Sequence, residues 1–219
     1  MRSPPQSRSP EHPAPATLSG LNNPGGRLPV TFYRGIEQLL LFEDYSMKDR
    51  TYRYFSGEPL YPFGYGLSYA HYAYANLKLS KTSLGAGDPL AVDLDVTNRS
   101  QRAGDEVVEL YLNFPAAPGA PIRALRGFER VHLPAGTTGH VHLDLSSRDL
   151  SLVNESGDRV IVPGDYSLTI GGGQPGTGAP SLQTTFTIRG QTNFTRVVFR
   201  RLPSRCSEKR LWSFPRIFL

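Results

Sequence analysis

The stretch Leu90-Ala-Val-Asp-Leu-Asp-Val-Thr97 alternates apolar and polar side chains residue by residue, and the turn-forming sequence Asn98-Arg-Ser follows it. Successive side chains of a β-strand point to opposite faces of the sheet, so a period of two indicates one buried and one solvated face. This stretch therefore predicts a strand of an antiparallel sheet that packs against a second layer. The apolar face consists of Leu90, Val92, Leu94 and Val96.

The same alternation recurs, with turn signals between the runs, across residues 72–190. A Pro163-Gly164 pair separates two runs and favours a tight turn. Ile122–Leu133 has Gly127 near its centre, and we expect two short strands there. Seven or eight short strands in about 120 residues predict a mainly β fold, an immunoglobulin or fibronectin type III-like antiparallel β-sandwich. The remaining runs are Ala75–Ser80, Glu106–Phe114, Gly139–Leu145, Val160–Val162, Asp165–Ile170 and Leu182–Ile188.

Residues 45–74 form an unusual aromatic stretch that holds eight of the eleven tyrosines. Glycines and prolines interrupt it at five positions between residues 57 and 66, which excludes a long helix. We predict an irregular connector whose rings supply apolar packing area. We also expect residues 27–70 to be partly exposed and to be the least stable ordered part of the chain.

The two termini differ in composition from the rest of the chain. Residues 1–24 are rich in Pro, Ser, Gly and Asn, which predicts disorder, and Met1–Thr17 has no apolar core typical of a signal peptide. Residues 191–219 hold seven basic side chains and one acidic one, while the whole chain has a net charge of +5. The excess positive charge therefore belongs to this tail. The single Cys206 excludes a disulfide-pinned antibody domain.

Three strings of residues make the chain recognisable. They are Asn23-Pro-Gly-Gly-Arg-Leu-Pro-Val-Thr-Phe32, Arg50-Thr-Tyr-Arg-Tyr-Phe55 and Leu60-Tyr-Pro-Phe-Gly-Tyr-Gly-Leu-Ser-Tyr69. They resemble the C-terminal region of family 3 glycoside hydrolases, the β-glucosidases and β-xylosidases. Later strings resemble the fibronectin type III-like domain of that family, in the same order: Gly104–Tyr111, Leu125–Arg130, Gly164–Tyr166 and Ile170–Gly172.

The resemblance implies a division of the chain into four parts. We expect a disordered segment at 1–24, the end of an α/β-sandwich domain with the aromatic connector at 25–71, the fibronectin type III-like domain at 72–190, and a basic tail outside the fold at 191–219. Met1–Ser19 departs from the family pattern. In the family, a barrel domain carries an aspartate nucleophile and the α/β-sandwich domain often supplies a glutamate acid/base, both upstream of these strings. We therefore expect a C-terminal fragment, or the product of a broken or misassigned reading frame, that is inactive alone.

Catalytic, metal and cofactor sites find little support in the residues. The acids Asp105, Glu106 and Glu109 lie near one strand, and we expect them to be solvated rim acids rather than the carboxylate pair of a glycosidase. His140 and His142 share a strand face but lack a third ligand, so we expect no metal. Gly171–Gly176 fits a dinucleotide-binding pattern, but a strand follows it where a helix is required. We expect no catalytic residues and no cofactor.

The aromatic connector offers the one candidate site. Arg50, Tyr52 and Arg53 are candidates for the rim of a substrate site, because tyrosine rings stack on sugars and arginines bond to hydroxyl groups. The alternative is that these residues pack the sandwich onto its parent domain.

Two functional hypotheses follow from these observations. In the first, the chain is the accessory region of a family 3 glycosidase and its partners are the catalytic domains. In the second, it is an independent module that binds polysaccharide or protein through an aromatic face or a free sheet edge. Binding of nucleic acid or of a membrane surface by the basic tail is a third alternative. We expect neither as a partner, since only the tail is basic. The compartment stays open, although the resemblance is to enzymes that are often extracellular or periplasmic.

Overall fold

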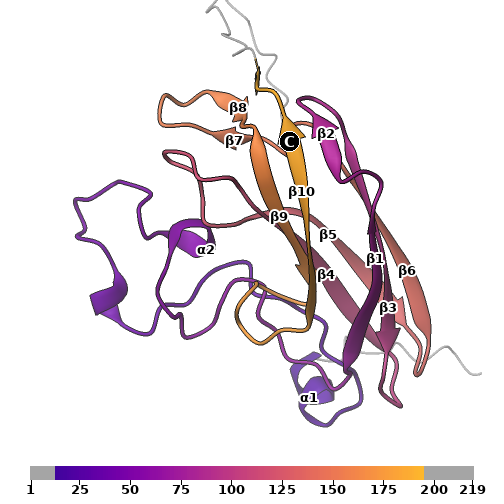
Figure 1. Ribbon diagram of the computed structural model, residues 1–219. Coiled ribbons are helices and arrows are strands. Elements are labelled where there is room, and N and C mark those ends of the chain that lie inside the picture. The colour runs from indigo at the N-terminus through magenta and orange to yellow at the C-terminus, as the bar shows by residue number, and fades with distance from the viewer. Residues whose placement is uncertain (1–12, 195–219) are drawn as a thin grey trace, which may run out of the picture.

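The computed structural model describes residues 13–194 and contains two β-sheets that pack face to face (Figure 1). The alternating stretch forms β3 (Leu90–Asn98), in which every second residue is buried. β3 lies between β1 (Tyr72–Leu79) and β6 (Thr138–Leu145), and both pairings are antiparallel. The polar members of the alternation therefore cover the outer face of this three-stranded sheet.

The second sheet has five strands in the order β2-β10-β9-β4-β5. β10 pairs with β2 in parallel, whereas the other pairings in this sheet are antiparallel. The five strands are β2 (Ser83–Gly85), β4 (Gly104–Asn113), β5 (Ala124–Leu133), β9 (Gly164–Gly171) and β10 (Ser181–Arg189).

The hydrophobic core lies between the two sheets. Leu94 of β3 and Val141 of β6 come from one sheet, and Leu110 of β4, Leu168 of β9 and Phe186 of β10 come from the other. All five are 2% exposed or less. Burial of such side chains stabilises a fold by about 1.5–3 kcal/mol each. The mainly β sandwich predicted from the sequence is confirmed.

The structure corrects the two strands expected around Gly127. Residues Ala124–Leu133 form the single strand β5, paired with β4 along its length. The register shifts between Leu110 and Tyr111, where Gly127 pairs with Leu110 and Leu125 pairs with Tyr111. One extra residue on β5 is accommodated as a β-bulge, which bends the strand without ending it.

A small third sheet continues the fold beyond Gly190. Its order is β11-β8-β7, from β7 (Leu152–Val153), β8 (Arg159–Ile161) and β11 (Thr192–Asn193). Phe194 packs against the core, and its backbone amide donates to the Arg159 carbonyl at 2.9 Å. Residues 191–194 of the expected tail are therefore part of the fold, and the rest of that tail lies outside the described residues.

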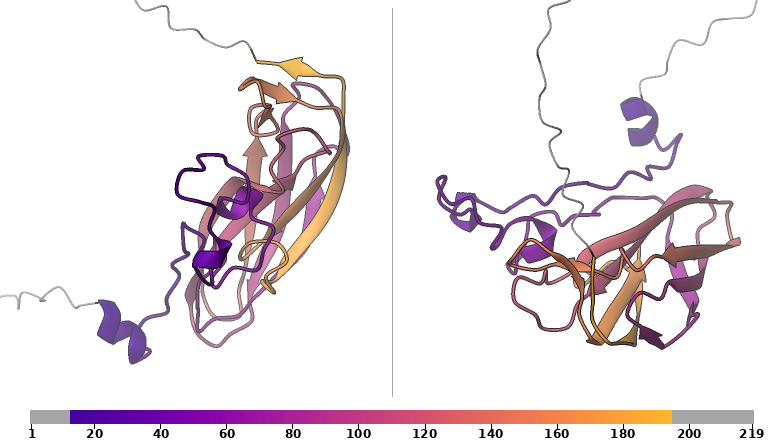
Figure 2. Two further views of the ribbon diagram at one scale, coloured as in Figure 1. Left: turned by 90° about the vertical axis from the view of Figure 1, so that its left-hand side faces the viewer. Right: turned by 90° about the horizontal axis from the view of Figure 1, so that it is seen from above.

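Residues 25–71, called the connector below, have little regular structure. They contain the 3-10 helix η1 (Ile36–Gln38), the helix α2 (Thr51–Tyr54) and a single bridge between Phe32 and Tyr61. Figure 2 shows the connector lying along one face of the sandwich, with an arm, residues 34–50 including η1, that extends away from it.

The part of residues 1–24 that the structure describes is ordered, against the expectation of disorder. The helix α1 (Pro13–Leu18) lies there. The Asn23 side-chain oxygen accepts hydrogen bonds from the Tyr69 amide at 2.8 Å and the Ser68 hydroxyl at 3.0 Å. These bonds from the connector hold a polar segment whose composition alone indicates disorder. Residues 1–12 lie outside the described residues.

Candidate functional site

A buried ion pair joins the connector to the sandwich. Arg27 donates from Nη2 to both carboxylate oxygens of Glu106, at 2.9 and 3.1 Å. The two side chains are only 10% and 3% exposed. The Tyr74 hydroxyl of β1 donates to the same carboxylate at 3.1 Å. Three distant segments of sequence therefore meet at Glu106 on β4.

Burial and the ion pair act in opposite directions on Glu106. Burial raises the pKa of its carboxyl group, and the bonds from Arg27 and Tyr74 offset only part of that rise. Breaking a buried pair by removing one partner leaves an uncompensated buried charge, which costs about 3–5 kcal/mol. The contact of Arg27 with Glu106 and Tyr74, called the junction below, is therefore a strong structural contact between the connector and the sandwich.

The other acidic residues of β4 have different environments. Glu109 is 3% exposed and accepts a hydrogen bond from the Tyr111 hydroxyl at 2.6 Å. Burial raises the pKa of its carboxyl group as well. Asp105 stays at the surface, where bonds from His132 and Arg130 lower its pKa. The expectation of solvated rim acids is wrong for Glu106 and Glu109. Glu106 lies on the inner face of β4, where Arg27 and Tyr74 bond to it, and Glu109 lies on the outer face, which the connector covers at Gly64.

Glu106 and Glu109 do not form a glycosidase pair. They lie three residues apart on one strand, so their side chains leave opposite faces of the sheet. A hydrolytic pair needs both carboxyl groups on the same sugar, about 5–10 Å apart. Each instead has a structural partner, Arg27 for Glu106 and Tyr111 for Glu109.

The connector backbone packs directly onto the outer face of β4 at Gly64. Gly64 is buried and has φ +77, a conformation that favours glycine. A Cβ atom there would overlap the Glu109 carboxylate. The Gly64 amide donates to the Leu28 carbonyl at 2.8 Å, which ties the two ends of the connector together.

The structure separates the three candidate rim residues. Tyr52 stacks on Phe63 with ring centroids 4.2 Å apart, contacts the edge of Tyr111, and accepts a hydrogen bond at its hydroxyl from the Leu125 amide. Arg50 donates to the Asp44 carbonyl within the connector. The Arg53 guanidinium lies over the Tyr54 ring, 5.6 Å from its centroid. Tyr52 therefore packs against the sandwich, while the side chains of the two arginines interact within the connector and the Arg53 carbonyl accepts a hydrogen bond from the Ile122 amide.

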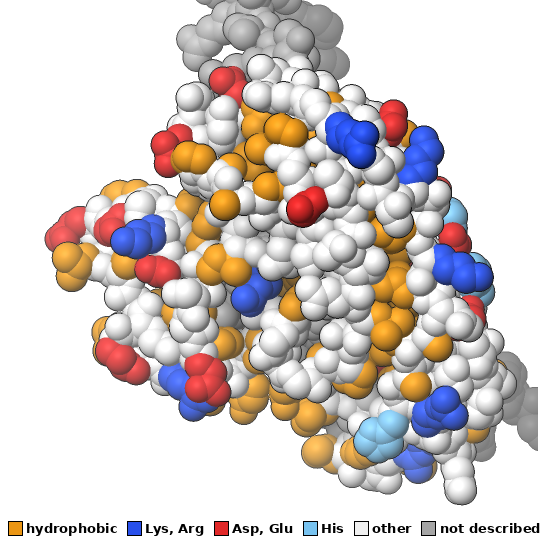
Figure 3. Space-filling model, in the orientation of Figure 1, with side chains coloured by type: hydrophobic (Ala, Val, Ile, Leu, Met, Phe, Trp, Pro, Cys, Tyr) orange, Lys and Arg blue, Asp and Glu red, His pale blue; other side chains and the backbone are white. Residues whose placement is uncertain are grey.

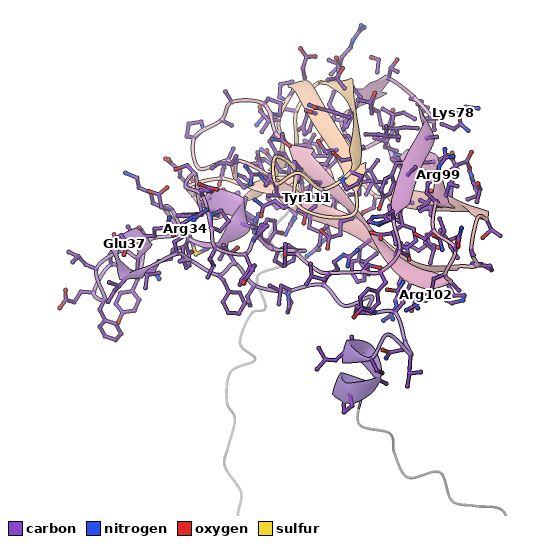
Figure 4. All side chains as sticks on the ribbon, turned by 90° about the horizontal axis from the view of Figure 1, so that it is seen from below. Arg34, Glu37, Lys78, Arg99, Arg102 and Tyr111 are labelled. Carbon is purple, nitrogen blue, oxygen red and sulfur yellow. The ribbon has the colours of Figure 1, made fainter. Side chains whose placement is uncertain are left out.

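Exposed apolar side chains gather on the connector and the helix before it. Of the eighteen large apolar side chains exposed in the described residues, fifteen lie between residues 18 and 69. Phe42 and Leu41 are 91% and 78% exposed on the arm. Figure 3 shows apolar side chains along the lower left of the molecule and on the arm. In Figure 4, Arg34 and Glu37 lie on this arm, whereas Tyr111 lies on β4 of the sandwich.

An apolar groove runs across the same region. It has a volume of about 770 Å³. Phe32, Tyr61, Tyr65 and Leu67 line it, and each is at least 36% exposed. A contiguous apolar surface of this kind marks an interaction site rather than an ordinary solvated surface.

His140 and His142 lie on the outer face of the three-stranded sheet, as the alternation predicts. His140 Nδ1 lies 2.9 Å from Asp95, and His142 Nδ1 lies 2.7 Å from Asp93. No group of three or more His, Cys, Asp or Glu side chains in residues 13–194 has the geometry of a metal site. Gly171–Gly176 leads from β9 into a loop that ends at β10, so no helix follows the glycines.

Two segments of the chain match known domain families. Residues 11–69 match the model of the glycosyl hydrolase family 3 C-terminal domain, and residues 106–174 match that of the fibronectin type III-like domain. The chain belongs to glycoside hydrolase family 3 and corresponds to the C-terminal region of its members. The match begins at residue 11, so the expectation that Met1–Ser19 departs from family 3 is wrong for residues 11–19.

The relatives of the chain include a β-xylosidase and a β-glucosidase, the two enzyme types named in the resemblance. The chain is similar to a xylan 1,4-β-xylosidase of Xylanibacter ruminicola, with 41% identity over 155 residues, 70% of this chain and 18% of that protein. A β-glucosidase of Rhizobium radiobacter is 36% identical over 172 residues, 70% of this chain and 21% of that protein. The chain thus spans about a fifth of the length of the curated family 3 relatives.

A solved family 3 structure has the same architecture. The β-glucosidase 3B from Thermotoga neapolitana, in complex with α-D-glucose, superposes with a TM-score of 0.73 at 29% identity. The match covers 84% of this chain and 27% of that chain.

None of the helices in residues 13–194 is long and apolar enough to cross a membrane.

Sequence reasoning missed the residues of the junction. The sequence marks Arg27 only as part of the Asn23–Phe32 string, and it predicts solvated positions for Glu106 and Glu109. Two acidic residues among the apolar residues of β4, with a tyrosine two positions after the second, were the available signal. Their partners lie far away in sequence, and local alternation cannot identify them.

Proposed function

We propose that the chain is the accessory C-terminal region of a family 3 glycoside hydrolase, which braces the catalytic domains and performs no hydrolysis itself. The concentration of exposed apolar side chains on the connector is the observation that carries this proposal, since a sandwich with its own complete core needs no such surface. The relatives named above are β-xylosidases and β-glucosidases, so β-xylosides and β-glucosides are the proposed substrates of the whole enzyme.

The connector has two sides, and each has a feature that a brace requires. Its inner side is fixed to the sandwich by the Arg27–Glu106 pair, the Gly64 contact and the contacts of Tyr52 with Tyr111 and Leu125. Its outer side presents the apolar groove and the arm. A rigid inner attachment and an apolar outer surface are what a docking element between two domains requires.

A complementation experiment tests the brace. The X. ruminicola xylosidase is truncated before its matching region, and the present chain is then added as a separate protein. We expect the chain to bind the truncated enzyme and to raise its melting temperature and residual activity. A Phe42→Ser/Leu41→Ser variant should bind more weakly, whereas Lys78→Ser, at an exposed position on β1, should bind as the wild type does. Equal binding by all three chains, or binding by none, contradicts the proposal.

The lack of intrinsic activity has a separate test. The chain alone is incubated with nitrophenyl β-xyloside and nitrophenyl β-glucoside, and release of nitrophenol is measured. We expect no release above that of a heat-denatured sample. Turnover that survives further purification and disappears in Glu106→Gln or Glu109→Gln would overturn the claim.

The substrate-rim role of Arg50, Tyr52 and Arg53 remains a proposal for the whole enzyme. A rim role predicts a higher KM for Arg50→Ala and Arg53→Ala in a full-length relative, with unchanged stability. The ring contacts of Tyr52 favour packing, so Tyr52→Ala should lower stability while KM stays the same.

A further inference from the structure

Four arginines gather where the connector meets β5 and β8. Arg53 comes from α2, Arg123 and Arg126 flank the first residues of β5, and Arg159 begins β8. The Arg53 carbonyl accepts a hydrogen bond from the Ile122 amide at 2.8 Å, so α2 lies against the segment that leads into β5. In Figure 1, α2 lies beside the sandwich, below β7 and β8. These four side chains are called the arginine cluster below.

Ser151 joins two members of the arginine cluster. Arg126 Nη2 donates to the Ser151 carbonyl at 2.7 Å, and Arg159 Nη1 donates to the Ser151 hydroxyl oxygen at 2.9 Å. Burial lowers the pKa of the Arg126 guanidinium, and the positive charges of Arg53 and Arg159 lower it further. Three positive charges therefore lie close enough to repel one another.

No carboxylate in residues 13–194 pairs with the arginine cluster. Arg27, Arg34 and Arg130 form ion pairs with acids, whereas none of the four cluster members does. The Asp149 carboxylate instead accepts hydrogen bonds from the amide and hydroxyl of Ser146. All four cluster side chains are half-buried. Moving a cation partly out of water costs free energy unless an anion pairs with it, so the cluster lacks a counterion.

The free nitrogen atoms of the arginine cluster can be reached from solvent. Within the cluster, only the Nε atoms of Arg53 and Arg126 are buried without a hydrogen-bond partner. The terminal nitrogens of Arg53, the Arg123 guanidinium and Arg159 Nη2 make no hydrogen bond to any residue from 13 to 194 and are not buried. These exposed N–H groups are therefore available to an anion that approaches from outside the chain.

An apolar hollow adjoins the arginine cluster at Arg53. It has a volume of about 410 Å³, and Val30, Met47, Tyr52 and Phe63 line it together with Arg53. Val30 and Met47 are each 50% exposed. A chain segment that places an apolar side chain in this hollow brings its neighbouring side chains close to the cluster. The surface therefore combines apolar contact area with unpaired positive charge.

We propose that the arginine cluster binds an acidic segment of the catalytic domains, in which aspartate or glutamate carboxylates flank apolar side chains. A guanidinium group binds a carboxylate through two parallel hydrogen bonds. Four such groups on three elements offer more donors than one small anion can accept, which favours several carboxylates on one segment. The assignment of the partner rests on the proposed bracing function. For Arg53, it is an alternative to the substrate rim.

The first test uses the full chain by itself, so its outcome does not depend on the bracing function. The probes are a blocked peptide of alternating leucine and glutamate, the same peptide with glutamine in place of glutamate, and inorganic phosphate. Binding is followed through the arginine Nε–Hε signals in ¹H–¹⁵N spectra, assigned by their loss in arginine variants. We expect saturable shifts with the glutamate peptide that weaken as NaCl is added, and none with the glutamine peptide.

Two variants and a matched control separate binding from folding. Arg53→Gln/Arg123→Gln removes guanidinium groups that make no hydrogen bond, so we expect an unchanged or higher melting temperature and about tenfold or greater weakening of peptide binding. Arg126→Gln removes the central charge and should also weaken binding. Arg99→Gln/Arg189→Gln changes the net charge equally at exposed positions outside the cluster, with Arg99 labelled in Figure 4, and should bind as the wild type does.

The second test uses the same variants in the complementation experiment with the truncated X. ruminicola xylosidase. We expect both cluster variants to bind the truncated enzyme about tenfold more weakly or worse, and the control to bind normally. If the wild type and the cluster variants bind equally well, the cluster lies outside the interface while the bracing function stands. If the wild type binds the glutamate peptide but not the truncated enzyme, the bracing function fails, and the assigned partner with it.

Three outcomes of the first test overturn the proposal. Absence of saturable shifts with the glutamate peptide means that the cluster does not bind carboxylates. Equal weakening in the cluster variants and in Arg99→Gln/Arg189→Gln assigns the binding to overall charge. Phosphate binding as tight as that of the glutamate peptide identifies a site for a free anion and contradicts an acidic protein segment.

Discussion

At the scale of single residues, the Arg27–Glu106 pair is a buried contact that holds the connector on the sandwich. Arg27→Ala leaves a buried carboxylate without its cation, so we expect a loss of about 3–5 kcal/mol in the free energy of unfolding, measured by urea denaturation. Arg34→Ala is the matched control, since it removes an ion pair to Glu58 whose side chains are 50% and 82% exposed. Exposed pairs contribute about 1 kcal/mol or less. Equal losses in the two variants would contradict the structural role of Arg27.

The same pair predicts a pH dependence with a definite sign. The pKa of Glu106 is raised in the folded state above its ordinary value of 4.5, so the folded protein binds this proton more tightly than the unfolded chain does. The contribution of Glu106 to stability is therefore largest below pH 4.5 and is lost as the pH rises through the folded pKa. In Arg27→Ala the carboxylate lacks its countercharge, so we expect the loss relative to wild type to be larger at pH 8 than at pH 4. Urea denaturation at both values measures the difference.

The His140 and His142 pairs predict a smaller effect. Hydrogen bonds that the imidazoles donate to the Asp95 and Asp93 carboxylates raise the pKa of His140 and of His142 above 6.5. Their contribution is complete below pH 6.5 and is lost as the pH rises through the folded pKa values. Thermal melts should show a small decrease over that range, which a His140→Asn/His142→Asn double variant should abolish. A decrease of the same size in the double variant would assign the effect to other groups.

At the scale of elements, Gly64 is where the connector backbone meets β4. Gly64→Ala places a Cβ at φ +77 and against the Glu109 carboxylate, whereas Gly176→Ala places one at φ +81 with no atom within 4 Å. The left-handed conformation costs about 1–2 kcal/mol in both variants. The difference between the two free energies of unfolding therefore isolates the overlap, and we expect Gly64→Ala to be clearly the less stable. Similar free energies of unfolding for the two variants would mean that the connector backbone shifts at Gly64 and relieves the overlap.

The irregular structure of the connector predicts fast exchange of its backbone amide hydrogens with solvent. Its α2 and η1 helices have four and three residues, and its strand pairing is a single bridge. We expect backbone amides between residues 33 and 60 to exchange faster than those of β3, β4 and β9 in hydrogen-exchange measurements. Protection of that stretch equal to that of the strands would show that the connector is as stable as the sandwich.

Much of the sandwich could be predicted from local alternation, and most of the junction could not. β3 and β6 have one solvated face, so period two identifies their core residues directly. β4 is buried on both faces along Val108–Leu112, because the connector covers its outer side. Alternation cannot distinguish a solvated face from a covered one, so it does not predict the burial of Glu109. Glu106 shares its face with Val108 and Leu110, and its burial depends on Arg27, a partner that alternation cannot identify. The β2–β10 pairing is equally invisible locally, since its partners are far apart in sequence.

At the scale of the whole molecule, the chain has a self-sufficient core and an apolar surface beside it. Phe42→Ser/Leu41→Ser removes side chains that are exposed, so we expect the free energy of unfolding to change by less than about 0.5 kcal/mol while binding of a hydrophobic dye decreases. Leu94→Ala, in the fully buried core, should cost about 2–5 kcal/mol. If the arm variant is destabilised as strongly as Leu94→Ala, the arm belongs to the fold and is not a docking surface.

The pairing of β2 with β10 has a consequence for biosynthesis. Ser83, near the start of the sandwich, finds its strand partner only in Thr187, near its end. While the chain emerges from the ribosome, the five-stranded sheet is incomplete. The apolar faces of β3 and β4 stay exposed until β9 and β10 are synthesised. Closing so large a loop makes folding slow. The nascent chain is therefore most vulnerable to aggregation just before its last strands appear, and this is the stage at which chaperones would protect it.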